Sequence, residues 1–356
     1  MITRRFGMAA LAAVVAWVPV GADAFAAEYP VLFRGVRPLG MGGAFLTLSN
    51  DENALFYNPA GLNDVKGFGG AGIVNPYAAL SENSVQLYQD IQDLEGTDSA
   101  QVANLLNQHV GEHHHIQAAV FPHVYAHNFA VGVLGNGSMD LDIRNPAFPE
   151  VVTDVTIDAA GLAGVAYGFW NQRLQVGVTG KYVRREGVVK TFQPADIVVD
   201  FDPLADRSTA TDFAFDVGAK VNLPVLLRPS VALVVENIGD LDFEGLGTIP
   251  QQINVGVGLH PDFWILSTTL AAEIHDVTKQ IEGDDDLYKR AHLGAELRFP
   301  RILAVQAGVN SGYYTAGVTL DFWILKLAAA TYAEELGAYA GQRADRRNVV
   351  QLSLGF

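Results

Sequence analysis

Three adjacent histidines, His113, His114 and His115, are the most prominent candidates for chemistry in this sequence. Imidazole nitrogens are common ligands of transition metals, so the run could hold an ion. Successive side chains in a strand point to opposite faces, however, and neighbouring histidines cannot easily converge on one ion. We therefore interpret the run as a solvated loop that leads into a strand, and we predict no metal site there.

The remaining candidates for chemistry are weaker. The acidic run Asp284-Asp285-Asp286 lacks the ligand spacing of a calcium loop, which favours a charged turn. The sequence contains no G-x-S-x-G motif, no P-loop and no paired metal motif. We therefore expect no enzyme, no catalytic residue and no cofactor.

Charged residues that alternate with apolar ones are more informative. Between Asp212 and Asn222 most aromatic and aliphatic residues stand at odd-numbered positions, and the positively and negatively charged residues stand at even-numbered positions. In a strand this parity places the two sets on opposite faces. The same parity places ten charged residues on faces turned away from lipid: Lys181, Arg185, Asp212, Asp216, Lys220, Glu236, Glu273, Glu296, Arg298 and Asp321. Because unpaired charges facing a dry core are costly, this pattern favours a wet or plugged interior in which opposite charges pair.

The elements that position these charges are short alternating segments. We find about fourteen: 68–76, 115–123, 127–141, 152–170, 173–188, 210–222, 229–241, 251–260, 264–276, 288–299, 303–311, 312–322, 324–335 and 346–356. Periodicity alone fits a sandwich as well as a barrel. The even number, and lengths near the ~9–11 residues that cross a bilayer, favour an all-β fold, a transmembrane antiparallel β-barrel over residues 67–356.

The N-terminus and the composition narrow the class further. Residues 1–26 carry Arg4 and Arg5, an apolar stretch and Ala-x-Ala spacings, which predicts a signal peptide cleaved after Ala26. No later run is long and apolar enough for a helical span, and no cysteine is present for a disulfide. A net charge of −16 with 23 Lys and Arg residues argues against nucleic acid as a partner.

One stretch departs from the strand pattern. From about Ser84 to Gly111 the apolar residues recur with helical spacing, which predicts two short amphipathic helices in a long loop, about residues 84–111. Such a loop could cover a barrel mouth, dip toward the membrane surface, or decorate the barrel without gating it.

The segment before the strands is rich in glycine. It contains Arg37-Pro38-Leu39-Gly40-Met41-Gly42-Gly43-Ala44-Phe45 and the turn Asn58-Pro59-Ala60. Irregular backbone at membrane depth is tolerated only where protein or a water-filled cavity surrounds it. We therefore expect residues 27–66 to form a hatch inside the barrel, with Asn58, Pro59, Ala60, Gly42 and Gly43 as candidates for gating.

The combination RPLGMGGAF followed by NALFYNPAGL resembles the N-terminal region of the FadL-like outer-membrane superfamily. That superfamily includes long-chain fatty acid and aromatic hydrocarbon transporters, PorV-like proteins and TraF-like barrels. The resemblance implies a 14-stranded barrel with an N-terminal hatch and, in the transporters, passive uptake of a hydrophobic small-molecule ligand that leaves through the wall. The alternative is a scaffold or anchor barrel that does not transport and that interacts with secretion, conjugation or surface proteins.

The chain ends in the alternating segment Val349 to Phe356. We predict that it is the closing strand, pairing with the first strand near Phe68, with its apolar face in the lipid of the bacterial outer membrane. By resemblance to other outer-membrane barrels, Phe356 would be recognised by the barrel-assembly machinery.

Overall fold

The computed structural model describes residues 28–93, 98–263, 265–281, 286–300 and 302–355. Its strands are β1 (Phe68–Val74), β2 (Pro76–Ser81), β3 (His113–Val120), β4 (His123–Ala126), β5 (Phe129–Arg144), β6 (Glu150–Phe169), β7 (Leu174–Phe192), β8 (Ser208–Asn222), β9 (Ser230–Ile238), β10 (Leu241–Asp242), β11 (Thr248–Ile249), β12 (Gln252–Leu259), β13 (Asp262–Phe263), β14 (Leu266–Ile274), β15 (Ala291–Arg298), β16 (Leu303–Asn310), β17 (Tyr313–Asp321), β18 (Leu325–Glu335) and β19 (Ala344–Gly355). The helices are α1 (Val36–Gly40), α2 (Glu82–Gln92), α3 (Ser99–Gln108), α4 (Pro194–Val199) and α5 (Leu287–Arg290), with 3-10 turns η1 (Glu52–Leu55) and η2 (Pro59–Asp64).

The strands form a closed antiparallel barrel of 14 strands, as the sequence predicts. Three barrel strands are interrupted, so β1 continues into β2, β3 into β4 and β12 into β13. The barrel closes where β19 pairs with β2, from Arg347 opposite Ser81 to Gln351 opposite Tyr77. This closure rules out the sandwich that periodicity alone leaves open.

The alternation of exposure confirms the predicted faces. In β8, Phe213, Phe215 and Val217 are 62%, 47% and 41% exposed, whereas Ala214 and Asp216 are each 1% exposed. Outward apolar side chains give the wall a surface suited to lipid, and the inward side chains are covered by protein. Among the described residues, no helix combines the length and hydropathy needed to cross a membrane.

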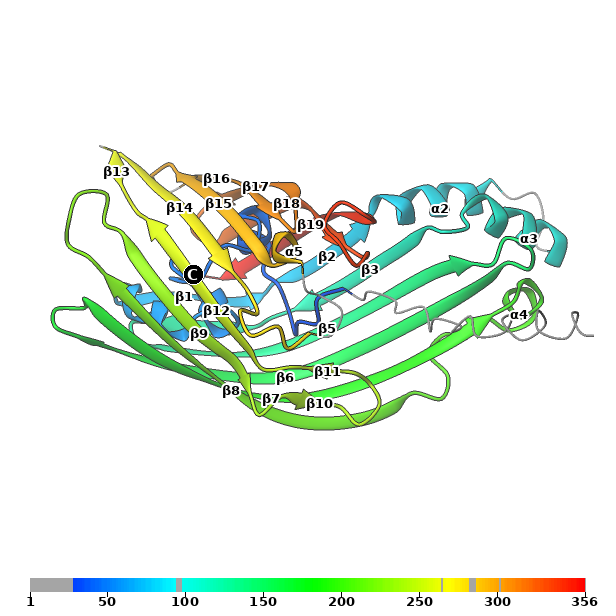
Figure 1. Cartoon of the computed structure of the whole chain (residues 1–356), viewed down its shortest axis with the longest axis horizontal. Coiled ribbons are helices and arrows are strands. Elements are labelled where there is room, and N and C mark those ends of the chain that lie inside the picture. Colours follow the sequence, from blue (N-terminus) through cyan, green and yellow to red (C-terminus); the bar gives the residue numbers. More distant parts are fainter. Residues whose placement is uncertain (1–27, 94–97, 264, 282–285, 301, 356) are drawn as a thin grey trace, which may run out of the picture.

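The wall is uneven in height (Figure 1). Strands β6 and β7 have 20 and 19 residues, whereas β15 and β16 have 8 each. The long green strands β5 to β8 therefore run beyond the rest of the barrel, and α2, α3 and α4 lie at that far end. Short turns, such as His127-Asn128 between β4 and β5, connect strands at the opposite end.

Residues 28–66 fill the interior and are called the hatch below. Met41, Phe45 and Leu46 are completely buried, as are Leu55 and Leu62. Side-chain caps start the two 3-10 turns, because Asp51 accepts from the main chain of Asn53 and Asn58 accepts from that of Ala60. The hatch packs against β16 to β18 through α1 and against β6 to β8 through η2.

The predicted helical loop is present. Ser81 and Asp98 cap α2 and α3, and Leu105, Leu106 and Ile143 belong to one buried apolar cluster. Ile143 shares its parity in β5 with the outward-facing Val131, so the helices pack on the outer face of the extended strands. The helical loop therefore stands beside the wall at the tall end of the barrel.

Several local expectations need correction. The predicted strand 229–241 ends at Ile238, and the following residues form the β10–β11 hairpin, which folds inward with Leu241 and Phe243 fully buried. Gly239, Gly245 and Gly247 have φ values of 96°, 95° and 88°, a conformation that lets the chain turn back into the lumen. Helix α4 lies where we predict a loop, and helix α5 lies at the start of the predicted strand 288–299. Asp286 caps α5 and favours a helix there.

The terminal strand closes the barrel with a small difference from expectation. After pairing with β2, β19 reaches β1 only at Val74 and Gly72, while Phe68 pairs with Ala126 of β4. Val350 and Leu354 are 57% and 40% exposed on the outer face, as predicted. The predicted signal peptide 1–26, the residues Asp284 and Asp285, and Phe356 lie outside the described residues.

Candidate ligand path through the plugged barrel

A buried arginine fixes the hatch to the wall. Arg37 of α1 donates to both carboxylate oxygens of Glu296 in β15, each at 2.7 Å, and to Asp51 Oδ2 at 2.5 Å. Burial disfavours the guanidinium charge, yet the carboxylates of Glu296 and Asp51 raise the pKa of Arg37 above its ordinary value. Arg37 therefore stays charged and holds two parts of the hatch against one strand.

Further ion pairs join the hatch to other strands. Lys220 of β8 pairs with Asp64, and Arg34 pairs with Glu334 of β18. Lys326 of β18 approaches Glu52 at 3.2 Å. Burial raises the pKa of Glu52, but the charges of Lys326 and His123, together with hydrogen bonds to the carboxylate, lower it to about 2. The hatch is therefore bound by charge at several points around the lumen.

The predicted gating candidates Gly42 and Gly43 lie against β15 and β16. Their φ values are 65° and 80°, and a Cβ at Gly42 would lie 2.6 Å from the carbonyl oxygens of Leu293 and Val309. His292 Nδ1 donates to the carbonyl of Gly42 at 2.8 Å. Only glycine allows the hatch backbone to approach the wall this closely. A role in gating stays a prediction.

The Asn58-Pro59-Ala60 turn is equally constrained. Asn58 donates to the carbonyl of Leu46 at 2.8 Å and accepts from the main chain of Ala60 at 3.0 Å. The wall opposite the turn is glycine: a Cβ at Gly177 would lie 2.4 Å from Pro59, and one at Gly218 would lie 2.1 Å from Asn58. The turn is therefore seated directly on β7 and β8, with no space between hatch and wall.

The ten charges predicted to face the lumen separate into two groups. Six are buried, namely Lys181, Arg185, Asp216, Lys220, Glu273 and Glu296. Lys181 pairs with Asp216 at 2.6 Å, and Glu273 accepts from the main chain of Leu46 in the hatch at 2.6 Å.

The other four are less buried. Glu236 and Asp212 are half-buried, and Asp212 accepts from the main chain of Asp242 in the inward hairpin at 2.8 Å. Arg298 and Asp321 are exposed near the ends of their strands. The parity argument thus identifies the face of a residue, but not its depth along the barrel.

Sequence reasoning missed several partners of these charges. Asp158 of β6 accepts two hydrogen bonds from Arg185, both at 2.8 Å, and Arg347 of β19 is 1% exposed and bonds to Glu28. Asp158 shares its parity with the buried Ala160 and Leu162, so the same alternation could have identified it. The hatch partners had no such signal, because irregular backbone has no period.

Among the cavities of the described residues, two lie on opposite sides of the hatch. One, of about 70 Å³, is lined by Leu39 and Gly43 and by residues 29–34 on the side of the long strands. The other, of about 1190 Å³, is lined by Thr47, Lys220 and other largely polar side chains near the short turns. Pockets for drug-sized ligands usually have ~300–1,000 Å³, so the first cavity is too small for one without movement of the hatch.

The barrel wall has an irregular seam beside the hatch. Asn75 separates β1 from β2, and Pro122 interrupts the neighbouring strand between β3 and β4. The Asn75 side chain accepts from the Phe121 main-chain N–H at 2.7 Å and donates to the Phe121 carbonyl. A side-chain amide therefore replaces the main-chain pairing at this level.

Aromatic side chains gather behind the seam. The rings of Phe33 and Phe56 in the hatch lie 5.3 Å apart, and Phe56 lies 5.0 Å from Phe121 in the wall. Tyr77 completes the group at 5.2 Å from Phe33. These four residues are called the aromatic cluster below. It is a compact apolar contact between the hatch, the small cavity and the seam.

The architecture defines a plugged transmembrane β-barrel. The chain is similar to the crystal structure of a Pseudomonas aeruginosa FadL homologue, with a TM-score of 0.52, 14% sequence identity, and coverage of 93% of this chain and 99% of that one. This likeness confirms the FadL-like barrel fold predicted from the N-terminal motif; similarity to PorV-like or TraF-like barrels stays a prediction.

Two further solved structures are similar with lower TM-scores. The Ralstonia pickettii toluene transporter TbuX has a TM-score of 0.49 and 11% identity, covering 91% of this chain and 98% of that one. The monoaromatic hydrocarbon channel CymD has a TM-score of 0.48 and 11% identity, covering 92% and 98%. No protein-family model matches the sequence, and no curated protein matches it.

Proposed function

We propose that this protein is an outer-membrane barrel for passive uptake of hydrophobic small molecules, such as a fatty acid or an aromatic hydrocarbon. The observation that carries the proposal is the aromatic cluster behind the seam, because it joins the hatch to an interrupted part of the wall. The FadL-like fold and the N-terminal motif support the same function.

The proposed route has three steps. A hydrophobic molecule is captured near the helical loop 84–111 and enters the small cavity beside Leu32 and Phe33. Residues 29–34 then move, since the cavity is too small to hold such a molecule in the closed arrangement. The molecule passes the aromatic cluster and leaves through the wall beside Asn75, driven by its concentration gradient.

The seam is the appropriate place for exit because few hydrogen bonds must break there. Asn75 is 1% exposed, and its side chain bonds to the main chain of Phe121 and to the ring of His123 in place of a continuous ladder. Lateral release also avoids the polar cavity near the short turns, where a hydrophobic molecule would contact Asp64 and Lys220.

The proposal is tested by measuring uptake of a hydrophobic fluorescent probe into proteoliposomes that contain the full chain. Replacing Asn75 with alanine removes the side-chain bridge and should change the rate of uptake at least severalfold. The matched control is Asn348→Ala, an exposed wall residue in β19 away from the seam. Equal uptake by liposomes with and without the wild-type protein would reject transport.

A non-transporting scaffold is the second candidate. The ion pairs that hold the hatch, and the 70 Å³ of the inner cavity, favour it. It predicts a ligand-free interior and a stable protein partner on an exposed loop. Transport instead predicts lipid or hydrocarbon that copurifies with the barrel and is lost when Asn58 is altered. Mass spectrometry of the purified barrel distinguishes the two.

A further inference from the structure

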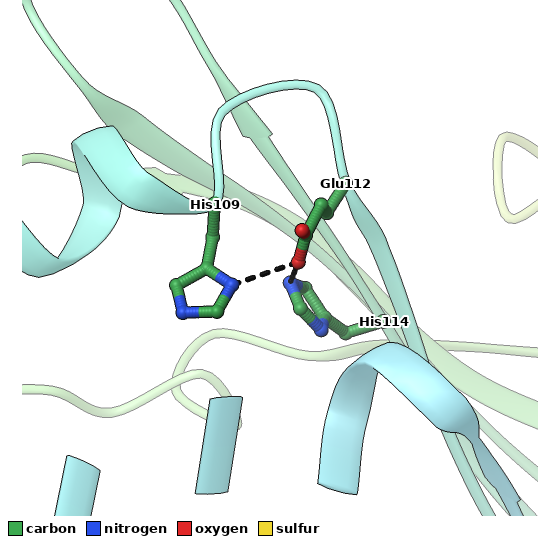
Figure 2. Close-up of side chains that lie close together, drawn as sticks. All are labelled: His109, Glu112 and His114. Carbon is green, nitrogen blue, oxygen red and sulfur yellow. Dashed lines mark hydrogen bonds and ion pairs between the residues drawn. The ribbon is translucent and has the colours of Figure 1, made fainter. Parts of the chain in front are cut away.

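A compact group of possible metal ligands lies at the base of the helical loop, on the outer face of the wall. His109 ends α3, Glu112 lies in the following turn and His114 is the second residue of β3. Figure 2 shows the carboxylate of Glu112 between the two imidazole rings. Glu112 Oε2 lies 2.7 Å from His109 Nδ1 and 3.8 Å from His114 Nε2.

His114 has no other evident role. Its side chain is completely buried, and neither ring nitrogen makes a hydrogen bond of normal length and angle, although the main chain of Asn83 lies close to the ring. A buried polar group without a partner is costly and calls for an explanation. A bound ion would satisfy the nitrogen that faces Glu112.

His109 is already oriented as a ligand. Its Nε2 lies 2.9 Å from Asp90 Oδ2 on α2, which leaves Nδ1 directed at Glu112. Metal-ligating histidines commonly donate their second ring N–H to a carboxylate, which fixes the tautomer and strengthens the ligand. Asp90 therefore supplies the outer support expected of a metal site.

The turn that carries Glu112 is held in place by the neighbouring strand. Gly111 donates to the carbonyl of Ile143 at 2.8 Å, and Ile143 donates to the carbonyl of Glu112 at 3.3 Å. Gly111 has a φ of 90°, which permits the sharp turn between α3 and β3. The three ligands are thus positioned without any ion.

We propose that His109, Glu112 and His114 bind a divalent transition metal of the zinc class. Ligands of tetrahedral zinc, at ~2.0–2.2 Å from the metal, lie about 3.3 Å from one another, and the observed 2.7 and 3.8 Å bracket this separation. The side chain of Glu112 is 32% exposed, so an ion can enter from solvent and water can occupy the fourth position.

A second group of potential ligands fits a cation poorly. Glu28, His115 and Asp140 lie close together on the lumen side, but Arg347 bonds to both oxygens of Glu28 at 3.0 and 2.7 Å. Its guanidinium already neutralises that carboxylate and would repel a metal ion.

The proposed ion would connect α3 to β3 and, through Asp90, to α2. Because the chain has no cysteine, no disulfide can cross-link this loop. A bound metal ion could do so instead. Metal binding would therefore hold the helical loop more firmly against the outer wall.

The test uses the full chain, purified in detergent without a polyhistidine tag and stripped with a chelator. Zinc is added in a calorimetric titration, and cobalt is added to record the absorption of a tetrahedral site. We expect one zinc ion per chain and protection of the helical loop from protease when zinc is present. Replacing Asp90 with asparagine should weaken binding about 10–100-fold.

Variants separate this site from other histidines. His109→Gln, Glu112→Gln and His114→Gln should each abolish tight binding, and Glu112→Gln guards against misfolding because its side chain is partly exposed. His113→Gln is the matched control, since His113 is adjacent but bonds to Asp140 and Asp142 on the opposite face. Absence of stoichiometric zinc binding by the wild type, or tight binding that survives Glu112→Gln, overturns the proposal.

Discussion

Arg37 in the hatch forms a two-pronged hydrogen-bonded ion pair with Glu296 in β15, both N–O distances being 2.7 Å. The two residues are separated by 259 positions in the sequence, and their side chains are 5% and 3% exposed. The pair joins the irregular N-terminal segment to the regular wall. The stability of the plugged state therefore depends on this contact more than on any exposed charge.

Replacing Glu296 with glutamine should destabilise the folded barrel by about 3–5 kcal/mol, because it leaves a buried arginine with an incomplete set of partners. Urea unfolding in detergent, followed by loss of heat-modifiable migration, measures the change. Arg298→Gln is the matched control, since Arg298 contacts the same carboxylate at 3.4 Å but has a 45% exposed side chain. Similar losses in both variants would contradict a specific role for the buried pair.

Replacing Gly42 with alanine should prevent the hatch from seating. The added Cβ would meet two wall carbonyl oxygens at 2.6 Å, and the φ of 65° adds backbone strain. Gly67→Ala has a similar φ of 64° with open space around it, so it should cost only about 1–2 kcal/mol. Protease digestion of the assembled barrel measures how well the hatch is protected in the Gly42→Ala and Gly67→Ala variants. Equal protection of the hatch in both variants would show that the close contact is unimportant.

The sequence predicts the wall far better than its contents. Strands such as β8 are readable because lipid and protein impose a period of two on Phe213, Phe215 and Asp216. The hatch has no such period, so its fold depends on single contacts such as Arg37 with Glu296 that only the folded structure brings together. The prediction of a solvated loop at the histidine run is wrong for a different reason: His113, His114 and His115 are all buried in β3, because helices cover the outer face of this strand and partners in the lumen cover the inner face.

Parity correctly separates those three histidines. His113 and His115 both bond to Asp140, while His114 faces Glu112 on the other side of the strand. His109 and Glu112 have no signal in a comparison of adjacent residues, because a helix end and a turn bring them to His114. Sites assembled at junctions between helix and strand escape a search based on either period alone.

The Glu52–Lys326 pair predicts a loss of stability in acid. The pKa of Glu52 falls from 4.5 to about 2 in the folded state, so its contribution is complete above pH 4.5 and is lost as the pH falls toward 2. The free energy of unfolding should therefore decrease less steeply in Glu52→Gln than in the wild type over this range. Glu244→Gln, in an exposed loop, should retain the wild-type slope. Parallel pH profiles for all three proteins would exclude a contribution from Glu52.

Deleting Phe356 should impair assembly in the membrane more than it alters ligand preference. The preceding strand β19 pairs with β18 and β2 and closes the barrel, and recognition of Phe356 during assembly is the prediction under test. The amount of heat-modifiable barrel in outer-membrane fractions measures assembly, and competition between hydrophobic probes measures preference. Phe68→Ala, an exposed aromatic residue at the start of β1, is the control; normal assembly without Phe356 would argue against a terminal signal.

The inward β10–β11 hairpin should act as a second barrier beside the hatch. Phe243 is fully buried, and the guanidinium carbon of Arg185 lies 4.2 Å from its ring centre. Phe243→Ala should remove about 3–5 kcal/mol of packing and loosen the hairpin, because the cavity left behind cannot fully collapse. We expect the variant to show higher single-channel conductance than the wild type in planar bilayers, and to be cleaved by added protease near Gly245. Phe213→Ala removes an outward-facing ring from the neighbouring strand β8 and should leave conductance unchanged; if Phe243→Ala also leaves it unchanged, the hatch alone seals the lumen.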